Sequence, residues 1–223
     1  MNKNSSDCFY KSTCPHIDNM CENTCQRHKI MSYLITNSGV GNPYKYINVA
    51  LKPQKSETDA YLELQNIKND VKAFVENGKN LFLASRNIQV GITTWCNKIL
   101  FNYYNNTWIE NGYKITGYFL YVPMFLSKAK SFEYRETDEF KHIDNMLRIV
   151  DLVVWDDIAS MKITTNEQNI LNTYIDHRII NNKSNIFNGC FDSNLENLVG
   201  KRLADRLNNC SKILVLEGNS RKK

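Results

Sequence analysis

The stretch ASRNIQVGITTW has the outline of a phosphate-binding loop between an apolar run and a helical pattern. Gly91, Thr93 and Thr94 lie where the motif G-x-x-x-x-G-K-S/T has a glycine and hydroxyl side chains. Backbone N–H groups and the helix dipole at such a loop attract phosphate. Arg86 occupies the first glycine position and Ile92 the lysine position, so the cation for the outer phosphates is lost. Alone, the loop fits either a nucleotide site or a plain strand-to-helix turn.

A second stretch, DLVVWDDIAS, is an apolar strand pattern that ends in Asp156 and Asp157. In nucleotide hydrolases the first acid at this place holds Mg²⁺, and the second orients the attacking water. Adjacent carboxylates repel each other, so a metal ion, a basic neighbour or solvent must stabilise them. Together with the glycine loop, the acidic pair favours a nucleotide-binding fold over an acidic turn without function.

The segment GKRLADRL places Arg202 and Arg206 on one face of a predicted helix. Arginines in such a position could contact a phosphate across a subunit boundary, as arginine fingers do. The alternative is a surface helix with two solvated arginines, and the segment alone does not separate the two readings.

Four of the seven cysteines lie within the first 25 residues. The candidate metal ligands are Cys14, His16, Cys21 and Cys25. Their number and type suit a structural tetrahedral Zn²⁺ site, and Cys8 or His28 could replace one of them. A segment this short has little core of its own, so a metal would supply much of its folding free energy. The alternative is a flexible arm with metal-free cysteines.

The elements that must position these motifs alternate between short apolar runs and helical patterns. Strands are predicted at 81–84, 116–122, 151–155, 185–190 and 211–218. This alternation indicates an α/β fold with a five-stranded parallel sheet covered by helices on both faces. The predicted domains are a zinc module at 1–32, a linker rich in Asn, Gly and Pro at 33–56, and a core at 57–223.

The composition of the 223 residues, 42% hydrophobic and 23% charged, is that of a folded globular protein. No apolar run approaches the roughly 18 residues that span a bilayer, and MNKNSSDCFYK lacks the apolar core of a signal peptide. We therefore expect a cytoplasmic protein with no membrane partner. The net charge of +5 is compatible with nucleic-acid binding without requiring it.

In order along the chain, five stretches resemble phage and prophage replication proteins related to the bacterial helicase loaders DnaC and DnaI, of the AAA+ P-loop class. These stretches are CPHIDNMCENTCQR, AFVENGKNLFLASRN, VDLVVWDDIAS, YIDHRI and RLADRL. The segment VVWDDIAS is the most specific of the matches, and the glycine loop is the least specific. The resemblance implies a RecA-like AAA+ core without a helical lid, and an N-terminal zinc module that binds the helicase.

The resemblance also implies roles for individual residues of the nucleotide site. The nucleotide-binding positions are Arg86, Asn87, Gly91, Ile92, Thr93 and Thr94. Thr93 and Asp156 match the Mg²⁺ positions, and Asp157 matches the acid that activates water. Arg202 and Arg206 match the region that supplies an arginine finger or a γ-phosphate sensor.

Two further parts of the family carry over with differences. Relatives often end the fourth strand with a Thr-x-Asn sensor, whereas NGC leaves Asn188 as the sensor candidate and Cys190 at the asparagine position. The segment VPMFLSKAK matches the place where loaders and initiators contact single-stranded DNA, so Lys128 and Lys130 are candidate DNA contacts.

The implied function is a DNA replication accessory protein that binds a replicative helicase and single-stranded DNA and is able to self-associate. Its implied cofactors are Zn²⁺ and ATP or ADP with Mg²⁺. Ile92, the altered glycine pattern and the changed sensor predict weak or absent ATP hydrolysis, although the acidic pair is intact. One alternative is a non-hydrolysing protein that regulates or sequesters the helicase. A sequence-specific DNA-binding zinc protein is a weaker alternative, because no recognition helix is evident.

Overall fold

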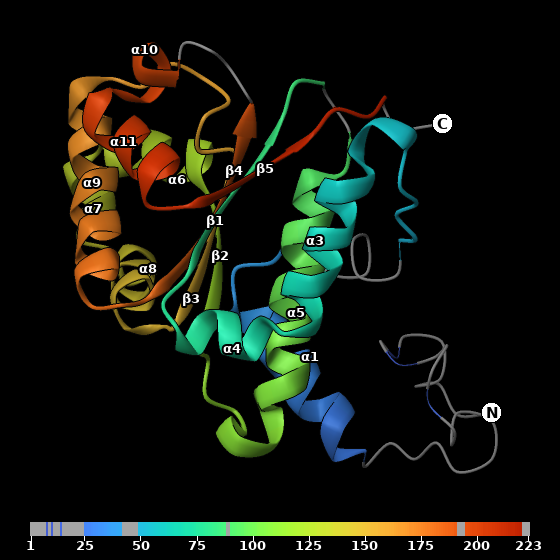
Figure 1. Ribbon diagram of the computed structural model, residues 1–223. Helices are drawn as coiled ribbons and strands as arrows, with labels where there is room; N and C mark the ends of the chain where they lie inside the picture. The colour runs from blue at the N-terminus through green and yellow to red at the C-terminus, as the bar shows by residue number, and fades with distance from the viewer. Residues whose placement is uncertain are drawn as a thin grey trace.

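A parallel β-sheet forms the centre of the computed structural model, which describes residues 8, 10, 14, 25–41, 49–87, 90–190 and 195–219. The strand order is β2-β3-β4-β1-β5, and every pairing between neighbours is parallel (Figure 1). The strands are β1 (Asn80–Ser85), β2 (Gly117–Tyr121), β3 (Leu152–Asp156), β4 (Ser184–Cys190) and β5 (Lys212–Leu216). The predicted five-stranded parallel sheet is therefore confirmed, with strand ends close to those expected.

The strands β1 and β3 consist mostly of apolar residues because both of their faces are covered. Along β1, Leu81 and Leu83 pack into one core, whereas Phe82 and Ala84 pack into a second core on the opposite face. Strand β3 is buried along its whole length. The edge strand β5 is only partly covered, with Lys212 exposed at its start. This burial pattern is typical of a parallel sheet between two helical layers.

One helical layer consists of the elements that flank β1 in sequence. Its members are α1 (Gln26–Asn37), the short 3₁₀ helix η1 (Lys55–Glu57), α3 (Thr58–Asn69), α4 (Val71–Glu76) and α5 (Ile92–Asn111). The long helix α5 lies directly on the sheet, and its buried Trp95 and Ile99 join the first core. Helix α1 packs against α5, so a helix that begins within the predicted zinc module belongs to the core layer (Figure 1). The domain boundaries at 32 and 56 remain predictions.

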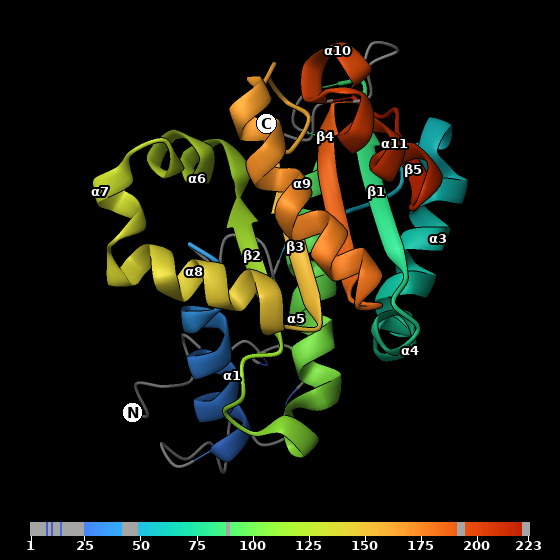
Figure 2. The same ribbon diagram turned by 90° about the vertical axis from the view of Figure 1, so that its left-hand side faces the viewer.

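The other layer covers the opposite face of the sheet (Figure 2). Its members are α6 (Val122–Ala129), α7 (Phe132–Arg135), α8 (Asp138–Ile149), α9 (Thr165–Ile180), α10 (Leu195–Val199) and α11 (Lys201–Asn209). Thr164 is the N-cap of α9 and forms a capping box with Glu167. In this motif each side chain accepts a hydrogen bond from the backbone N–H of the other residue. Among the helices that the structure describes, none has the length and apolar character needed to cross a bilayer.

Candidate nucleotide site

The loop after β1 leads into α5 at the carboxyl edge of the sheet. Gly91 is the N-cap of α5 and has φ 95° and ψ 20°, a left-handed conformation that favours glycine. The backbone N–H of Trp95 donates to the carbonyl oxygen of Gly91 at 3.0 Å, which closes the first helical turn. This first turn contains no acidic residue of its own, but its Thr93 contacts the carboxylate of Asp156 from β3. The helix dipole favours an anion at the helix start, and a cation between that anion and Asp156 would offset the charge of the carboxylate.

Thr93 and Asp156 meet although 63 residues separate them in the sequence. The Thr93 hydroxyl donates to Asp156 Oδ1 at 3.0 Å, and Asn188 Nδ2 donates to the same oxygen at 2.5 Å. Helix α5, β3 and β4 each contribute one of the three side chains. Asp156 is only 5% exposed. The two residues implied as the Mg²⁺ positions are thus adjacent, and a hydroxyl beside a carboxylate is an oxygen donor set that suits this ion.

Asn188 is fully buried and connects the acidic pair to the fourth strand. Its Oδ1 accepts from the backbone N–H of Asp157 at 2.8 Å, and its Nδ2 also contacts Cys96 Sγ at 3.3 Å. Asp157 has φ 61°, which the hydrogen bond to Asn188 helps to hold. The sequence singled out Asn188 as a sensor candidate, and the structure adds that it fixes the geometry of both acids.

A glycine beside Asn188 allows the loop after β3 to lie across the end of β4. A Cβ added at Gly189 would come within 2.8 Å of Ala159 Cβ and 2.9 Å of its backbone nitrogen. Any larger residue would push this loop, and Asp157 with it, away from the sheet. Gly189 is therefore a residue of the site that the motif comparison missed. Its signal in the sequence was a glycine inside a predicted strand, in the pair NG.

Burial raises the pKa of Asp156, and the neighbouring Asp157 raises it further. Hydrogen bonds from Asn188 and Thr93 act in the opposite direction without cancelling the rise. Burial also raises the pKa of Asp157. Both carboxyl groups are thus less stable in the charged form than in water, and a bound divalent cation would favour that charged form. The electrostatics of the pair agree with a cation site.

Asp156→Asn is expected to stabilise the metal-free protein. The folded pKa of Asp156 lies above its unfolded value, so the folded state binds more protons and its stability falls as the pH rises through this interval. Asparagine removes that loss at neutral pH and can still accept from Thr93. We expect thermal unfolding at pH 7 with chelator to shift upward by about 2–4 °C, the effect of about 1 kcal/mol in a chain of this length.

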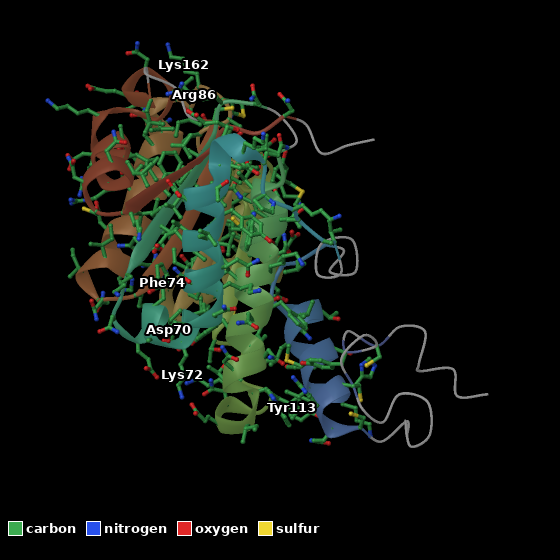
Figure 3. All side chains as sticks on the ribbon, turned by 45° about the vertical axis from the view of Figure 1, so that its right-hand side comes forward. Asp70, Lys72, Phe74, Arg86, Tyr113 and Lys162 are labelled. Atoms are coloured by element: carbon green, nitrogen blue, oxygen red, sulfur yellow. The ribbon has the colours of Figure 1, made fainter. Side chains whose placement is uncertain are left out.

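The difference between this variant and the wild type should shrink as the pH falls, because the Asp156 carboxyl becomes protonated and then carries no buried charge. The exposed Asp70 lies at the opposite end of the molecule from Arg86 (Figure 3), and Asp70→Asn serves as the matched control with no expected shift. A lower midpoint for Asp156→Asn at pH 7 would show that the charged carboxylate stabilises the fold.

The start of the loop is attached to the segment that follows β5. Arg86 lies 3.5 Å from Glu217 in an exposed ion pair, and Asn87 Nδ2 donates to the carbonyl oxygen of Gly218 at 3.1 Å. Ile92 is partly buried and packs against the core under α5. The position of the missing lysine is therefore an apolar contact, and the nearby arginine has an acidic partner within its own chain.

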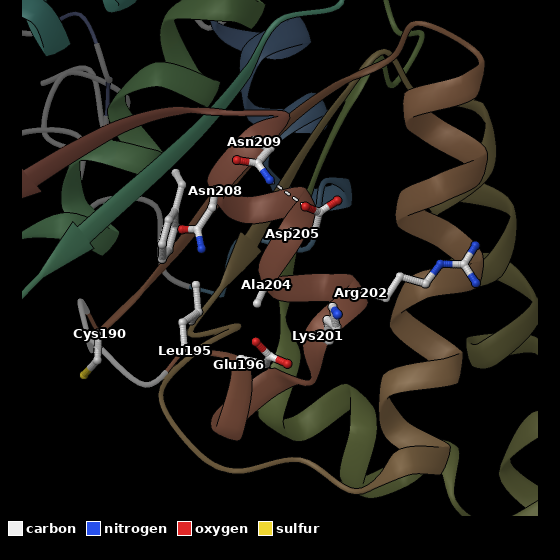
Figure 4. Close-up of a pocket in the computed structure, with 10 residues that line it drawn as sticks. Cys190, Leu195, Glu196, Lys201, Arg202, Ala204, Asp205, Asn208 and Asn209 are labelled. Atoms are coloured by element: carbon white, nitrogen blue, oxygen red, sulfur yellow. Dashed lines mark hydrogen bonds between the residues drawn. The ribbon is translucent and has the colours of Figure 1, made fainter.

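The two candidate finger arginines on α11 share one acidic partner on α9. Arg206 Nε donates to Asp176 Oδ1 at 2.9 Å, and Arg202 forms an ion pair with the other carboxylate oxygen. Arg202 is one of the residues that line a hollow of about 800 Å³, as is Asn208, and its side chain extends from α11 toward α9 (Figure 4). Arg202 and Arg206 thus lie together on α11, and their role as arginine fingers remains a prediction. A role across a subunit boundary would require them to leave Asp176.

The candidate DNA contacts and zinc ligands lie in separate parts of the fold. Lys128 and Lys130, at the end of α6, form ion pairs with acidic residues of α8 and α9. Cys14 is partly buried and Cys25 exposed, whereas His16 and Cys21 lie outside the described residues. Within the described ranges, no group of three or more His, Cys, Asp or Glu is placed to hold a metal. The zinc site therefore remains a prediction.

Comparison with known proteins finds similarity at the level of the fold. No family model and no curated protein sequence matches the chain. The structure resembles the DnaC helicase loader with a TM-score of 0.62 and 20% identity, covering 78% of this chain and 99% of that one. It resembles DnaI with a TM-score of 0.61 and 16% identity, covering 82% and 95%.

A third similar structure is the replication initiator DnaA bound to AMPPCP and single-stranded DNA. Its TM-score is 0.59 at 16% identity, and the match covers 79% of this chain and 51% of that one. These likenesses concern the fold: the chain has an α/β fold like that of the DnaC and DnaI helicase loaders and of the replication initiator DnaA. The fold class expected from the sequence is confirmed to this extent.

Proposed function

We propose that the protein is a DNA replication accessory protein of the helicase-loader type with a weakened nucleotide site. The observation that carries the proposal is the contact of Thr93 with Asp156, kept although Ile92 replaces the motif lysine. A Thr–Asp pair at the ends of α5 and β3 has a clear use in holding Mg²⁺ next to phosphate. The fold shared with DnaC and DnaI supports the same proposal.

In this proposal the helix start at Gly91 receives the phosphates, together with the loop positions Arg86, Asn87 and Thr94. Thr93 and Asp156 would hold Mg²⁺, directly or through water, and Asp157 would orient a water molecule. When bound, the ion neutralises charge on the phosphate oxygens. No lysine supplies the second positive charge, so we expect weak nucleotide binding and slow or absent hydrolysis.

The proposed partners follow from the resemblance to loaders. The zinc module, with Cys14, His16, Cys21 and Cys25 as ligands, would contact the hexameric replicative helicase. Helix α6 would contact single-stranded DNA, the nucleic acid that DnaA carries in the comparison structure. Self-association through α11 would bring Arg202 to a neighbouring subunit. The protein would act in the cytoplasm of a bacterium or of a phage-infected cell.

A second candidate function is a non-hydrolysing protein that binds the helicase and regulates or sequesters it. The observation in its favour is that Ile92 packs as a core residue, while Arg202 and Arg206 are both paired with Asp176 in their own chain. A scaffold that only binds its partner needs neither a phosphate cation nor a free arginine finger.

Calorimetric titration of ATP with and without Mg²⁺ tests the proposed state of the site. We expect a dissociation constant weaker than about 100 μM, because the missing cation removes a strong charged contact. Binding in the low micromolar range would contradict the weakened site.

Elemental analysis should find one Zn²⁺ per chain. Adding the protein to a helicase assay then separates the two functions, since a loader increases helicase assembly on single-stranded DNA and a sequestering protein decreases it.

A further inference from the structure

The two lysines at the end of α6 have acidic partners of different kinds. Lys130 Nζ lies 3.0 Å from Glu167 Oε1, and the Glu167 side chain is only 8% exposed. Lys128 Nζ lies 2.9 Å from Glu139 Oε1, and that carboxylate is 55% exposed. The neighbouring helices α6, α7 and α8 form one flank of the sheet, next to β2 (Figure 2). Separating Lys130 from Glu167 should therefore cost more free energy than separating Lys128 from Glu139.

Glu167 also has a structural task. Its Oε2 accepts from the backbone N–H and from the hydroxyl of Thr164, both at 2.7 Å, in the capping box that begins α9. Burial acts to raise the pKa of Glu167, but the hydrogen bonds from Thr164 and Lys130 outweigh it and the pKa is lowered. If Lys130 moved to a phosphate, a nearly buried carboxylate would lose its only charged partner among the contacts described here. Loss of a charged hydrogen bond at a buried group is costly.

Glu139 is bound much less tightly to its surroundings. It lies in the first turn of α8 and has the Tyr134 hydroxyl as a second partner at 3.1 Å. Exposed ion pairs such as Lys128–Glu139 contribute little to stability, because water and salt solvate both charges when they separate. Lys128 can therefore leave Glu139 for a phosphate at a small cost in free energy. Glu139 then keeps its hydrogen bond from the Tyr134 hydroxyl.

We infer that Lys128 is the phosphate contact of α6, and that Glu167 holds Lys130 away from nucleic acid. This inference rests on the proposed binding of single-stranded DNA and specifies which cation of that surface acts. Lys130 and Glu167 also line a cavity of about 150 Å³ that Asp157 borders, so this ion pair forms part of the wall next to the acidic pair. Lys130 accordingly stabilises the fold around the site, and Lys128 contacts a phosphate of the nucleic acid.

Salt-dependent binding of a fluorescein-labelled oligothymidylate, followed by anisotropy, tests the inference. Each phosphate neutralised on a single strand contributes about 0.7 to the slope of log K against log salt. Lys128→Gln should lower the slope by about 0.7 and weaken binding about fivefold at 0.1 M salt. Lys130→Gln should leave the slope unchanged within about 0.2. The opposite ranking of the two variants overturns the inference while the proposed DNA binding stands.

Glu167→Gln should produce a gain of binding. Glutamine keeps the capping box, because it accepts from Thr164 through its amide oxygen, and it releases Lys130. We expect the slope to rise by about 0.7 and the affinity at 0.1 M salt to rise about fivefold. Adding Lys130→Gln to this variant should reverse the gain. The inference is overturned if Glu167→Gln unfolds at the same temperature as the wild type and binds the oligonucleotide no more tightly.

Glu139→Gln is the matched control, because it removes the same charge from the same surface. Its slope should change by less than about 0.2, since Lys128 already leaves Glu139 for phosphate. An equal gain for Glu139→Gln and Glu167→Gln would assign the effect to net charge and overturn the inference. If neither lysine variant changes the slope, the proposed DNA-binding role of α6 fails, and the inference fails with it.

Discussion

Arg178→Met is expected to lower the free energy of unfolding by about 3–5 kcal/mol, because several buried oxygen atoms would lose their hydrogen-bond donor. Arg178 is fully buried near the end of α9. Its guanidinium donates at 2.7 to 3.2 Å to five acceptors, which are the carbonyl oxygens of Leu147, Val150, Asp151 and Ser184 and the side-chain oxygen of Asn185. This one side chain therefore connects α8, the residue before β3, α9 and β4.

The acceptors explain the size of the effect. Methionine fills a similar volume but donates no hydrogen bond, so buried carbonyl oxygens would be left without their donor at about 1–3 kcal/mol each before relaxation. Burial lowers the pKa of Arg178 to about 9, which leaves the guanidinium charged at neutral pH. Its charge is solvated by carbonyl dipoles in place of water. Arg178→Lys would keep the charge but not the planar array of donors, and we expect an intermediate loss.

Urea unfolding of Arg178→Met and Arg178→Lys measures the loss of unfolding free energy directly. Arg148→Met is the matched control, because Arg148 forms a partly exposed pair with Asp144 at 3.0 Å and should cost at most about 1 kcal/mol. Equal midpoints for Arg178→Met and Arg148→Met would contradict the role of the buried guanidinium. Both variants keep the residues of the nucleotide site, so their effects should appear in stability and not in ligand affinity.

Arg178 also illustrates what the sequence could not reveal. In YIDHRI it appears as a basic residue in a polar helix, and its burial depends on carbonyl oxygens from three other elements. The same holds for Asp176, whose partners Arg202 and Arg206 come from α11. Partners distant in sequence leave no spacing that a motif can record. The sheet, in contrast, was predictable, because short apolar runs such as those of β1 and β3 alternate with helical patterns.

The geometry of the candidate nucleotide site was predictable only where a local spacing defines it. Gly91 and Thr93 follow from the loop pattern, and Asp156 follows from its place at the end of an apolar strand. The bond from Asn188 to Asp156 depends on the register of β3 and β4, which pairs Trp155 with Phe187. The spacing of residues in the sequence does not predict that register. The motif therefore identified the residues, and the fold determined which of them touch.

Ile92→Lys is expected to strengthen binding of ATP with Mg²⁺ by about 10- to 150-fold. A hydrogen bond from a charged donor contributes about 1.5–3 kcal/mol, and each 1.4 kcal/mol changes affinity tenfold. The backbone at Gly91 and the Thr93–Asp156 pair are already in place, so the lysine restores the one element of the motif that the chain replaces with an apolar group. Removing Ile92 from its partly buried contact should cost about 1 kcal/mol of stability.

Calorimetry on Ile92→Lys and on Ile92→Met separates charge from shape. Methionine has a similar length and no charge, so its affinity should equal that of the wild type. Adding Asp156→Asn to Ile92→Lys should remove the part of the gain that depends on Mg²⁺. An unchanged affinity in Ile92→Lys, with a wild type that already binds tightly, would mean that another basic group of the chain neutralises the phosphates.

The same variant distinguishes the two proposed functions. If Ile92→Lys gains ATP hydrolysis, then Asp157 and the rest of the hydrolytic arrangement are competent, and Ile92 alone keeps the site inactive. If it gains binding without hydrolysis, the pairing of Arg202 and Arg206 with Asp176 becomes the next barrier. That second outcome favours a scaffold that holds the helicase over a motor that releases it, because nucleotide turnover would then be limited at two independent places.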